Sequence, residues 1–252
     1  MKNIERFSDR VENYVLYRPH YPAEIIRFLK EDLKLTKQWV IADIGSGTGI
    51  SSELFISNGN VVYAVEPNPK MRQAAVNEFR HDKNFISVNG TAENTSLSEN
   101  SIDLIIAGQA FHWFDKAPSK KEFQRIAKPD AYLALIWNER ESNSDFQQAY
   151  EQMLFEFAPD YAEVYQNNVD ETAISDFFSP QPYEMVTFFN SQFFDFEGLK
   201  GRLLSCSYAP QEHHPNFEPM VRRLKKIFDQ FSFDDRLEFK YNCKLYYGHI
   251  RA

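Results

Sequence analysis

The stretch of this chain richest in chemical information is residues 39–49, WVIADIGSGTG. A short apolar run ends at an acidic residue, Asp43, and three glycines follow within five positions. A turn without side chains lets the backbone lie against a ligand, and the helix after it directs its free N–H groups to the same place. The pattern predicts a loop that binds a nucleotide-type cofactor. The loop residues expected to take part are Gly45, Ser46, Gly47 and Gly49.

The spacing of these glycines discriminates between nucleotide cofactors. The dinucleotide fingerprint Gly-x-Gly-x-x-Gly requires glycine at position 50, where this chain has Ile50. The third glycine, Gly49, comes one residue early. An NAD(P)-dependent oxidoreductase therefore stays open as an alternative, but the loop disfavours it.

Polar and aromatic residues follow the next three predicted strands. Glu66 comes 17 positions beyond the last glycine of the loop, where a carboxylate can accept both hydroxyls of a ribose. After the third strand, the small side chain of Ala92 leaves room for a flat ring, and Glu93 follows it. After the fourth strand, GQAFHWF at 108–114 places His112 in an aromatic cluster. Because ligands bind beyond the carboxyl ends of parallel strands, we expect these loops to form one site.

The elements that position these loops alternate along the first 140 residues. Continuous apolar runs predict buried strands, and patterns of period 3.6 predict the helices between them. The predicted strands are 39–44, 61–65, 85–88, 102–108 and 131–137, and the predicted helices are 22–33, 48–58, 69–80 and 115–127. A turn is predicted at Pro129 and Asp130. Since each helix returns the chain to the same sheet edge, the strands pair in parallel in a doubly wound α/β fold.

The second half of the chain has a different pattern. A helical stretch over 146–157 precedes a polar section, predicted to be irregular, that ends at Pro180. Residues 184–194 predict a sixth strand, and a strongly amphipathic helix begins at Asn216. Residues 237–248 alternate between apolar and mostly polar side chains, as in a strand with one wet face, which is typical of antiparallel pairing.

Composition limits the remaining classes of function. The chain has 252 residues, 43% of them hydrophobic, and a net charge of −8. It can bury one substantial core, and its acidic balance disfavours a nucleic-acid partner. No apolar run is long enough for a membrane span, and the N-terminus is charged where a signal peptide would be apolar. Two cysteines and the adjacent His213 and His214 predict neither a disulfide framework nor a metal site. We expect a cytoplasmic monomer or homodimer.

The loops that follow the first four predicted strands together resemble those of the class I S-adenosylmethionine-dependent methyltransferases. The likeness is greatest to the small-molecule branch, methyltransferase type 11, which includes ubiquinone/menaquinone-type and trans-aconitate-type enzymes. It spans about residues 14–138 and includes RPHYP at 18–22. The loops that carry it are residues 43–49, Glu66, residues 90–93 and residues 108–114. The resemblance implies a Rossmann-like seven-stranded sheet, mostly parallel with an antiparallel last strand, and direct in-line methyl transfer from S-adenosylmethionine to a small-molecule acceptor.

The resemblance also assigns roles to individual cofactor-binding residues. Gly45 and Gly47 would lie under the methionine part and the ribose, Asp43 would orient the loop and the amino group, and Glu66 would hold the ribose hydroxyls. Gln109 would offer its backbone to the amino group. The residues placed around the adenine are Pro67, Met71, Thr91, Ala92 and Glu93. Many relatives have an aspartate where this chain has Thr91, which leaves the adenine amino group to Glu93 or to a backbone carbonyl.

The acceptor is not identified by these motifs, but residues that could face it are. If the acceptor atom carries a proton, His112 is the base best placed in the sequence. Guanidinium groups at Arg18 and Arg140 would suit an anionic acceptor, and a structural role for both stays open. The substrate-facing candidates are Tyr14, Tyr17, Arg18, His20, Tyr21, Trp137, Asn138 and Arg140.

Several segments exceed what the core sheet needs, and we expect them to cover the site. The chain is predicted to be a single domain, 1–252, with a core of about 37–142 and 181–252. A helical lid is predicted from about 1–36, 143–180 and 197–236. A non-catalytic cofactor- or partner-binding module is the remaining alternative, since aromatic residues of the sixth strand could form an interface.

Overall fold

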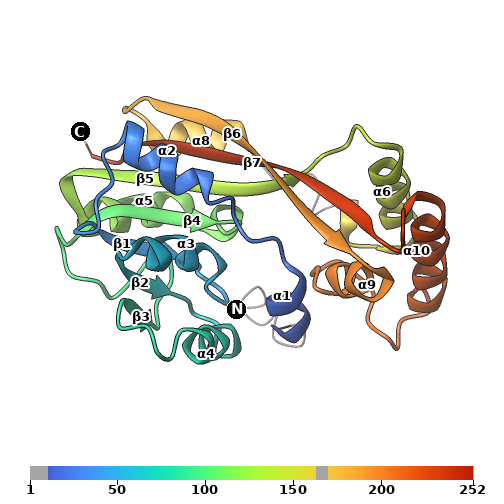
Figure 1. The fold of residues 1–252 in the computed structure, drawn as a ribbon. Coiled ribbons are helices and arrows are strands. Elements are labelled where there is room, and N and C mark those ends of the chain that lie inside the picture. Colours follow the sequence, from blue (N-terminus) through green and yellow to red (C-terminus); the bar gives the residue numbers. More distant parts are fainter. Residues whose placement is uncertain (1–10, 163–169, 252) are drawn as a thin grey trace.

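The computed structural model describes residues 11–162 and 170–251, and a seven-stranded sheet lies at its centre (Figure 1). The strand order is β3-β2-β1-β4-β5-β7-β6. The strands are β1 (Val40–Ile44), β2 (Val61–Val65), β3 (Phe85–Val88), β4 (Ile102–Gly108), β5 (Ala127–Arg140), β6 (Tyr183–Phe194) and β7 (Leu237–His249). Strands β1 to β5 pair in parallel, whereas β7 runs antiparallel to both β5 and β6. The predicted Rossmann-like sheet with its antiparallel last strand is confirmed.

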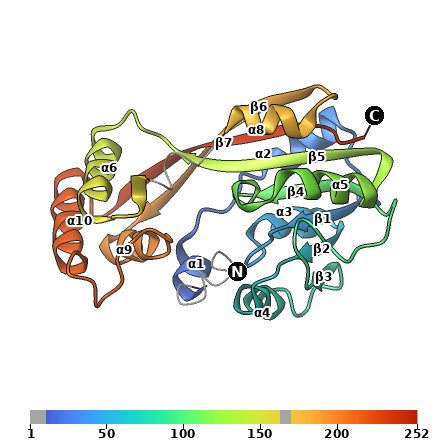
Figure 2. The same cartoon turned by 180° about the vertical axis from the view of Figure 1, so that it is seen from behind.

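Helices cover both faces of the core sheet (Figures 1 and 2). On one face, α2 (Glu24–Asp32) and α3 (Ile50–Asn58) bury apolar side chains against β1, β2 and β4. On the other, α5 (Lys116–Ile126) and α8 (Glu171–Phe178) pack against the same strands and β5. Adjacent residues of β1, such as Ile41 and Ala42, belong to opposite clusters, as expected for a strand covered on both sides. Helix α4 (Pro69–Glu78) lies beside β3.

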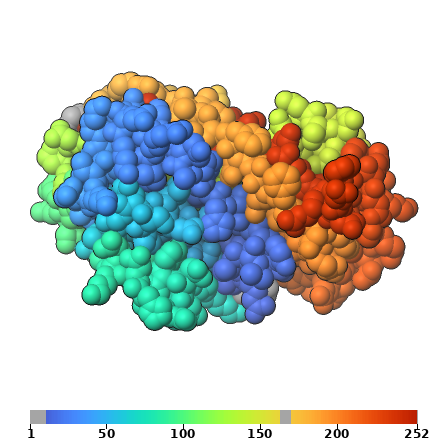
Figure 3. Space-filling model, in the orientation of Figure 1, coloured from blue at the N-terminus to red at the C-terminus, as the bar shows by residue number. Residues whose placement is uncertain are grey.

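Three further helices form what we call the helical lobe: α6 (Asp145–Phe157), α9 (Phe196–Leu204) and α10 (Phe217–Phe231). They pack around the parts of β6 and β7 that extend beyond β5, at the end of the molecule away from β1–β3 (Figure 1). The lobe has its own apolar cluster, separate from the two core clusters. Helix α1 (Val11–Tyr17) contacts both α9 and α4, and in the space-filling view it lies between core and lobe (Figure 3).

Several local predictions are wrong. Residues 171–178 of the section before Pro180 are not irregular but form α8, whose N-cap Asp170 accepts a hydrogen bond from Ala173 N–H at 3.0 Å. Pro129 and Asp130 do not form a turn; they lie within β5, beside a register shift in its pairing with β4. Helices α1 and α9 were not predicted, since α1 is short and buries no residue fully and α9 contains two glycines.

The predicted lid segments do not all lie in one place. Helices α2 and α8 pack on the core sheet, where Ile25 and Ile174 are fully buried, and are therefore core layers rather than lid. The segments that form α6, α9 and α10 make the helical lobe. Residues 1–10 of the lid segment 1–36 and residues 163–169 of the lid segment 143–180 lie outside the described residues. Within the parts of the chain that are described, no helix has both the length and the apolar character needed to cross a bilayer.

Candidate active site

The loop after β1 adopts a backbone that only glycine accommodates readily. Gly45 and Gly49 have φ angles of +70° and +91°, which L side chains rarely adopt. A Cβ on Gly45 would lie 2.7 Å from the Ala110 side chain, and one on Gly49 would lie 2.5 Å from the ring of Phe79. The glycines are therefore required by both the turn and its packing.

Asp43, the last polar residue of β1, fixes this loop to the helix that follows it. One carboxylate oxygen, Oδ2, accepts hydrogen bonds from Ser51 Oγ at 2.7 Å and from Ser52 Oγ at 2.6 Å. The other, Oδ1, is buried and has no hydrogen-bond partner among the described residues. Burial raises the pKa of Asp43 to about 6, although the two serine hydroxyls oppose the shift.

Glu66 holds the loop from the neighbouring strand. Its Oε2 accepts a hydrogen bond from Gly47 N–H at 2.9 Å, and its Oε1 accepts one from Asn68 N–H at 2.7 Å. The residue is 8% exposed, and burial raises the pKa of its carboxyl group while these backbone bonds lower it. The ends of β1 and β2 are thus joined by a carboxylate at the predicted position.

A cavity of about 320 Å³ opens beside this loop, and we call it the glycine-loop cavity. Its walls come from the loops that follow β1, β2, β3 and β4, which meet at one edge of the sheet as predicted. The lining residues are Tyr14, Gly45, Gly47, Glu66, Pro67, Asn68, Met71, Thr91, Ala92, Glu93, Gly108, Gln109, Ala110, Trp113 and Phe114. Three predicted residues, Asp43, Ser46 and Gly49, support the loop from behind: Ser46 N–H donates to the Val65 carbonyl at 3.2 Å, and Gly49 is the N-cap of α3.

Two residues of the cavity wall are held by specific contacts. Glu93 accepts hydrogen bonds from Asp115 N–H at 3.0 Å and Ser119 Oγ at 3.4 Å, at the start of α5. Burial works against ionisation, but these bonds lower the pKa of Glu93 overall. Gln109 has a φ angle of +54°, rare for a residue with a side chain, and its Nε2 donates to the Asn138 carbonyl at 3.0 Å. Backbone strain of this kind is concentrated at ligand sites.

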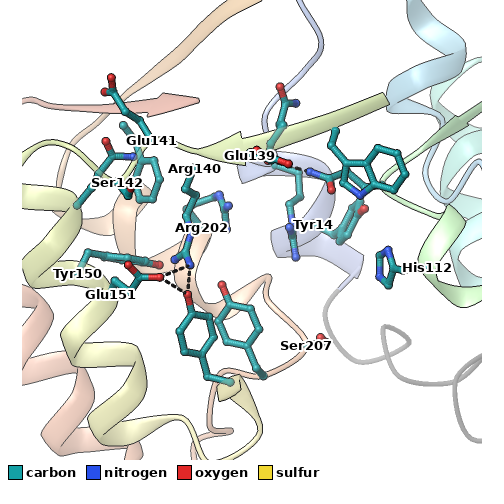
Figure 4. Close-up of a pocket in the computed structure, with 18 of the residues that line it drawn as sticks. Tyr14, His112, Glu139, Arg140, Glu141, Ser142, Tyr150, Glu151, Arg202 and Ser207 are labelled. Atoms are coloured by element: carbon teal, nitrogen blue, oxygen red, sulfur yellow. Dashed lines mark hydrogen bonds and ion pairs between the residues drawn. The ribbon is translucent and has the colours of Figure 1, made fainter. Parts of the chain in front are cut away.

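A second cavity of about 480 Å³, which we call the arginine cavity, is lined by the side chains drawn in Figure 4. Tyr14, Gln109 and Trp113 line both cavities and mark where they meet. Five further predicted residues line only the second cavity: Arg18, His112, Trp137, Asn138 and Arg140. The remaining wall comes from the end of β5, from β7, and from α6, α9 and the segments that follow them. It includes Glu139, Glu141, Gln147, Tyr150, Glu151, Tyr161, Arg202, Tyr208 and Phe239.

Three predicted substrate-facing residues do not line either cavity. The ring of Tyr17 packs on Gly201 of α9, where an added Cβ would lie 2.1 Å from it. Tyr21 is buried in the core cluster beneath Gly108. His20 hydrogen-bonds through Nδ1 to Glu53 Oε2 at 2.6 Å on the exposed surface. These residues position α1 and α2. Because they lie close in sequence to Tyr14 and Arg18, which do line a cavity, the sequence alone could not distinguish the two groups.

The sequence reasoning missed the lobe's contribution to the second cavity. Arg202 lies in α9, and Tyr150 lies in α6, among side chains whose helical spacing predicts core packing. Both are buried in the lobe, and both also face the cavity. The one local signal for Arg202 is weak: it is an arginine among the apolar residues of the short, glycine-containing segment that forms α9.

Comparison with known proteins identifies the core. Residues 42–135 match the methyltransferase domain family. An uncharacterized methyltransferase of Mycobacterium tuberculosis is 35% identical over 138 residues, 54% of this chain and 53% of the relative. An uncharacterized methyltransferase of Schizosaccharomyces pombe is 30% identical over 149 residues, 59% of this chain and 58% of the relative. The matched segment thus spans little more than half the length of these relatives.

Solved structures extend the likeness in fold to nearly the whole chain. A structure described as a type II methyltransferase from Anaeromyxobacter dehalogenans has a TM-score of 0.68 and 20% identity, covering 93% of this chain and 99% of that one. A phosphoethanolamine N-methyltransferase of Haemonchus contortus, solved with phosphomonomethylethanolamine and S-adenosylhomocysteine, has a TM-score of 0.57 and 14% identity, covering 96% and 57%. Residues 42–135 therefore match a methyltransferase domain, and the fold of nearly the whole chain is like that of solved methyltransferase structures.

Proposed function

We propose that this chain binds S-adenosylmethionine in the glycine-loop cavity and transfers its methyl group directly, in line, to a small-molecule acceptor in the arginine cavity. The observation that carries the proposal is the junction of the two cavities at Tyr14, Gln109 and Trp113. A cofactor on one side and an acceptor on the other would meet there. The family match supports this reading over the oxidoreductase alternative.

The described residues fit an adenosyl group. Gly47 presents bare backbone to the cavity, since among the described residues a Cβ there would meet only the Met71 side chain within 4 Å, at 3.5 Å. Each oxygen of Glu66 accepts one backbone N–H bond and keeps a lone pair for a ribose hydroxyl. Ala92 is small and lies in the wall where a flat ring would rest. The buried, unpaired Oδ1 of Asp43 adds negative potential under the loop, which favours a cationic ligand.

When bound, S-adenosylmethionine supplies a methyl group on a positively charged sulfur, and the carbon–sulfur bonding pair returns to sulfur as the methyl leaves. The chain's residues need only hold the acceptor and exclude water. Orientation of this kind contributes on the order of 7–11 kcal/mol to lowering a barrier. His112 lines the acceptor side and can take a proton from a hydroxyl, phenol or amine acceptor, whereas an ionised carboxylate needs no base.

Calorimetry with S-adenosylmethionine and S-adenosylhomocysteine tests the cofactor assignment. We expect both to bind, and Glu66→Ala to weaken binding on the order of 100-fold, because two charge-assisted hydrogen bonds are lost. Glu78→Ala, at an exposed position on α4, is the matched control and should not change the affinity. No heat from either ligand, or an unchanged affinity in Glu66→Ala, would overturn the assignment.

A radiolabelled methyl transfer assay separates an enzyme from a binding module. Labelled S-adenosylmethionine is incubated with carboxylate, phenol and amine acceptors, and we expect label in at least one product. His112→Asn should lower kcat on the order of 100-fold for a protonated acceptor and leave cofactor affinity unchanged. Tight cofactor binding without transfer to any acceptor class would favour the non-catalytic module.

A further inference from the structure

Three arginine side chains line the arginine cavity: Arg18 follows α1, Arg140 ends β5, and Arg202 lies in α9. Arg202 is 5% exposed, and the side chain of Arg140 is 19% exposed. Guanidinium groups stay charged at any physiological pH, and a buried charge is costly unless it is paired. Each of the three guanidinium groups therefore needs a negatively charged partner, either from the protein or from a ligand.

Arg140 is only partly satisfied. Its Nη2 donates a hydrogen bond to the Tyr161 hydroxyl, and Glu151 Oε1 lies 4.0 Å from the same nitrogen (Figure 4). Its Nη1 is buried without a hydrogen-bond partner among residues 11–162 and 170–251. The Tyr150 hydroxyl is also buried without such a partner in the described parts of the chain, and the Arg140 guanidinium lies 5.6 Å from the centre of its ring. Two unused donors therefore lie at one end of the cavity.

The other two arginines donate to neutral or weakly acidic groups. Arg202 donates through Nε to the Tyr241 hydroxyl at 3.1 Å and through Nη1 to Cys206 Sγ at 2.9 Å. Arg18 donates through Nη2 to the Ser205 carbonyl at 3.1 Å. Burial raises the pKa of the Cys206 thiol, but the neighbouring Arg202 and Arg18 lower it by more, so that the pKa falls to about 6.

The described carboxylates do not balance this charge. Glu139 is paired with Lys244 at 2.7 Å, and Glu141 points away from the arginine groups (Figure 4). Glu151, whose Oε1 lies 4.0 Å from Arg140 Nη2, is the remaining carboxylate beside the arginines in the described wall. The described wall therefore carries an excess of positive charge, and its two unused donors match the two oxygens of one carboxylate.

We propose, building on the methyltransferase function above, that the acceptor is an aromatic monocarboxylic acid whose carboxylate binds Arg140 and the Tyr150 hydroxyl, beside Arg202. A guanidinium binds a carboxylate with two parallel hydrogen bonds, and the unused Nη1 supplies one of them. The aromatic body packs among the cavity's rings, which include Tyr150, Phe239 and Trp137. Its opposite end, which carries the atom to be methylated, lies toward Tyr14 and His112, where the two cavities meet (Figure 4).

Matched acids and amides test this proposal on the full chain saturated with S-adenosylhomocysteine. The probes are benzoate, 4-hydroxybenzoate, phenylacetate and cinnamate, each titrated beside its primary amide, with phenyl phosphate as the dianion. We expect at least one acid to bind at least tenfold more tightly than its amide and more tightly than phenyl phosphate. No binding by any acid, equal binding of acid and amide, or tighter binding of phenyl phosphate would overturn the proposal.

Variants of Arg140 and Tyr150 test whether these two side chains cause the preference for the acid over the amide. Arg140→Leu should weaken acid binding at least 30-fold, and Arg140→Lys should recover only part of it, because lysine keeps the charge but not the planar pair of donors. Tyr150→Phe, which keeps the ring, should weaken the acid a few-fold and leave the amide unchanged. Arg222→Leu, exposed on α10, is the control. Acid binding that is unchanged in Arg140→Leu would contradict the proposal.

The same titrations separate the two levels of inference. S-adenosylhomocysteine binding is measured first in every variant, and we expect its affinity to change less than twofold in Arg140→Leu and Tyr150→Phe. If the cofactor product does not bind the unmodified protein, the proposed methyltransferase function fails. If it binds while acids and amides are not distinguished, only the carboxylate proposal fails.

Discussion

The two cavities of this protein are built in different ways. The glycine-loop cavity is formed largely by backbone that follows short parallel strands, with Glu66 and Asp43 fixing the loop through hydrogen bonds. The arginine cavity is formed by long side chains that converge from β5, β7, α1 and the helical lobe. A backbone-built site leaves little freedom to substitute, whereas a side-chain-built site can change its ligand through a few replacements. The comparison suggests one fixed ligand and one that varies among related chains.

The largest expected effect concerns the helical lobe, whose apolar cluster is separate from those of the core. Leu224 of α10 is fully buried, and Leu224→Ala should lower the free energy of unfolding of the lobe by about 3 kcal/mol. Hydrogen exchange should accelerate in α10 and not in β1, because separate clusters can open separately. The matched change Leu29→Ala, on α2 in the core, should accelerate exchange in β1 instead. Equal acceleration of both regions in Leu224→Ala would show that core and lobe unfold as one unit.

The glycine-loop side should also carry a pH dependence of its own, which comes from Asp43. The pKa of Asp43 in the folded state, about 6, lies above its ordinary value of 3.8, so its stabilising contribution is complete below pH 3.8 and is lost as the pH rises through 6. The difference of about two pKa units corresponds to about 3 kcal/mol. Urea unfolding of the ligand-free protein should therefore show stability falling from pH 4 to pH 7 relative to Asp43→Asn. Parallel curves for the two proteins would mean that Asp43 keeps an ordinary pKa.

The same contrast explains how much of the site could be predicted from the sequence. The glycine loop and Glu66 depend on local constraints, a left-handed turn and a fixed distance to the next strand end, and both are visible as spacing. Arg140 and Arg202 meet only because β6 and β7 extend beyond β5 and carry α9 back to the end of β5. No local pattern encodes that return. The fold of the core was predictable because each strand is apolar on both faces, whereas α8 was missed because it is short and lies in a polar segment.

Adding a single methyl group to the glycine loop should weaken cofactor binding, whereas the same change in the helical lobe should not. Gly45→Ala forces a side chain into a left-handed backbone and against Ala110, so the loop must shift, and affinity for S-adenosylhomocysteine should fall on the order of 100-fold. Gly198→Ala in α9, where the added methyl group meets the Phe194 side chain at 3.0 Å, is the control and should leave this affinity unchanged. Calorimetry measures both. An unaffected Gly45→Ala would mean that the loop backbone does not contact the cofactor.

The smallest expected effect tests whether the two cavities are independent. Tyr14 lines both, and its helix α1 contacts α4 of the core and α9 of the lobe. Tyr14→Ala should therefore weaken S-adenosylhomocysteine and the tightest-binding acid by about tenfold each, or about 1.4 kcal/mol. Tyr208→Ala, whose side chain lines only the arginine cavity, should weaken the acid and not S-adenosylhomocysteine. If Tyr14→Ala changes one affinity and not the other, the shared wall does not couple the sites. In that case each cavity binds its ligand on its own, and the order of binding should be random.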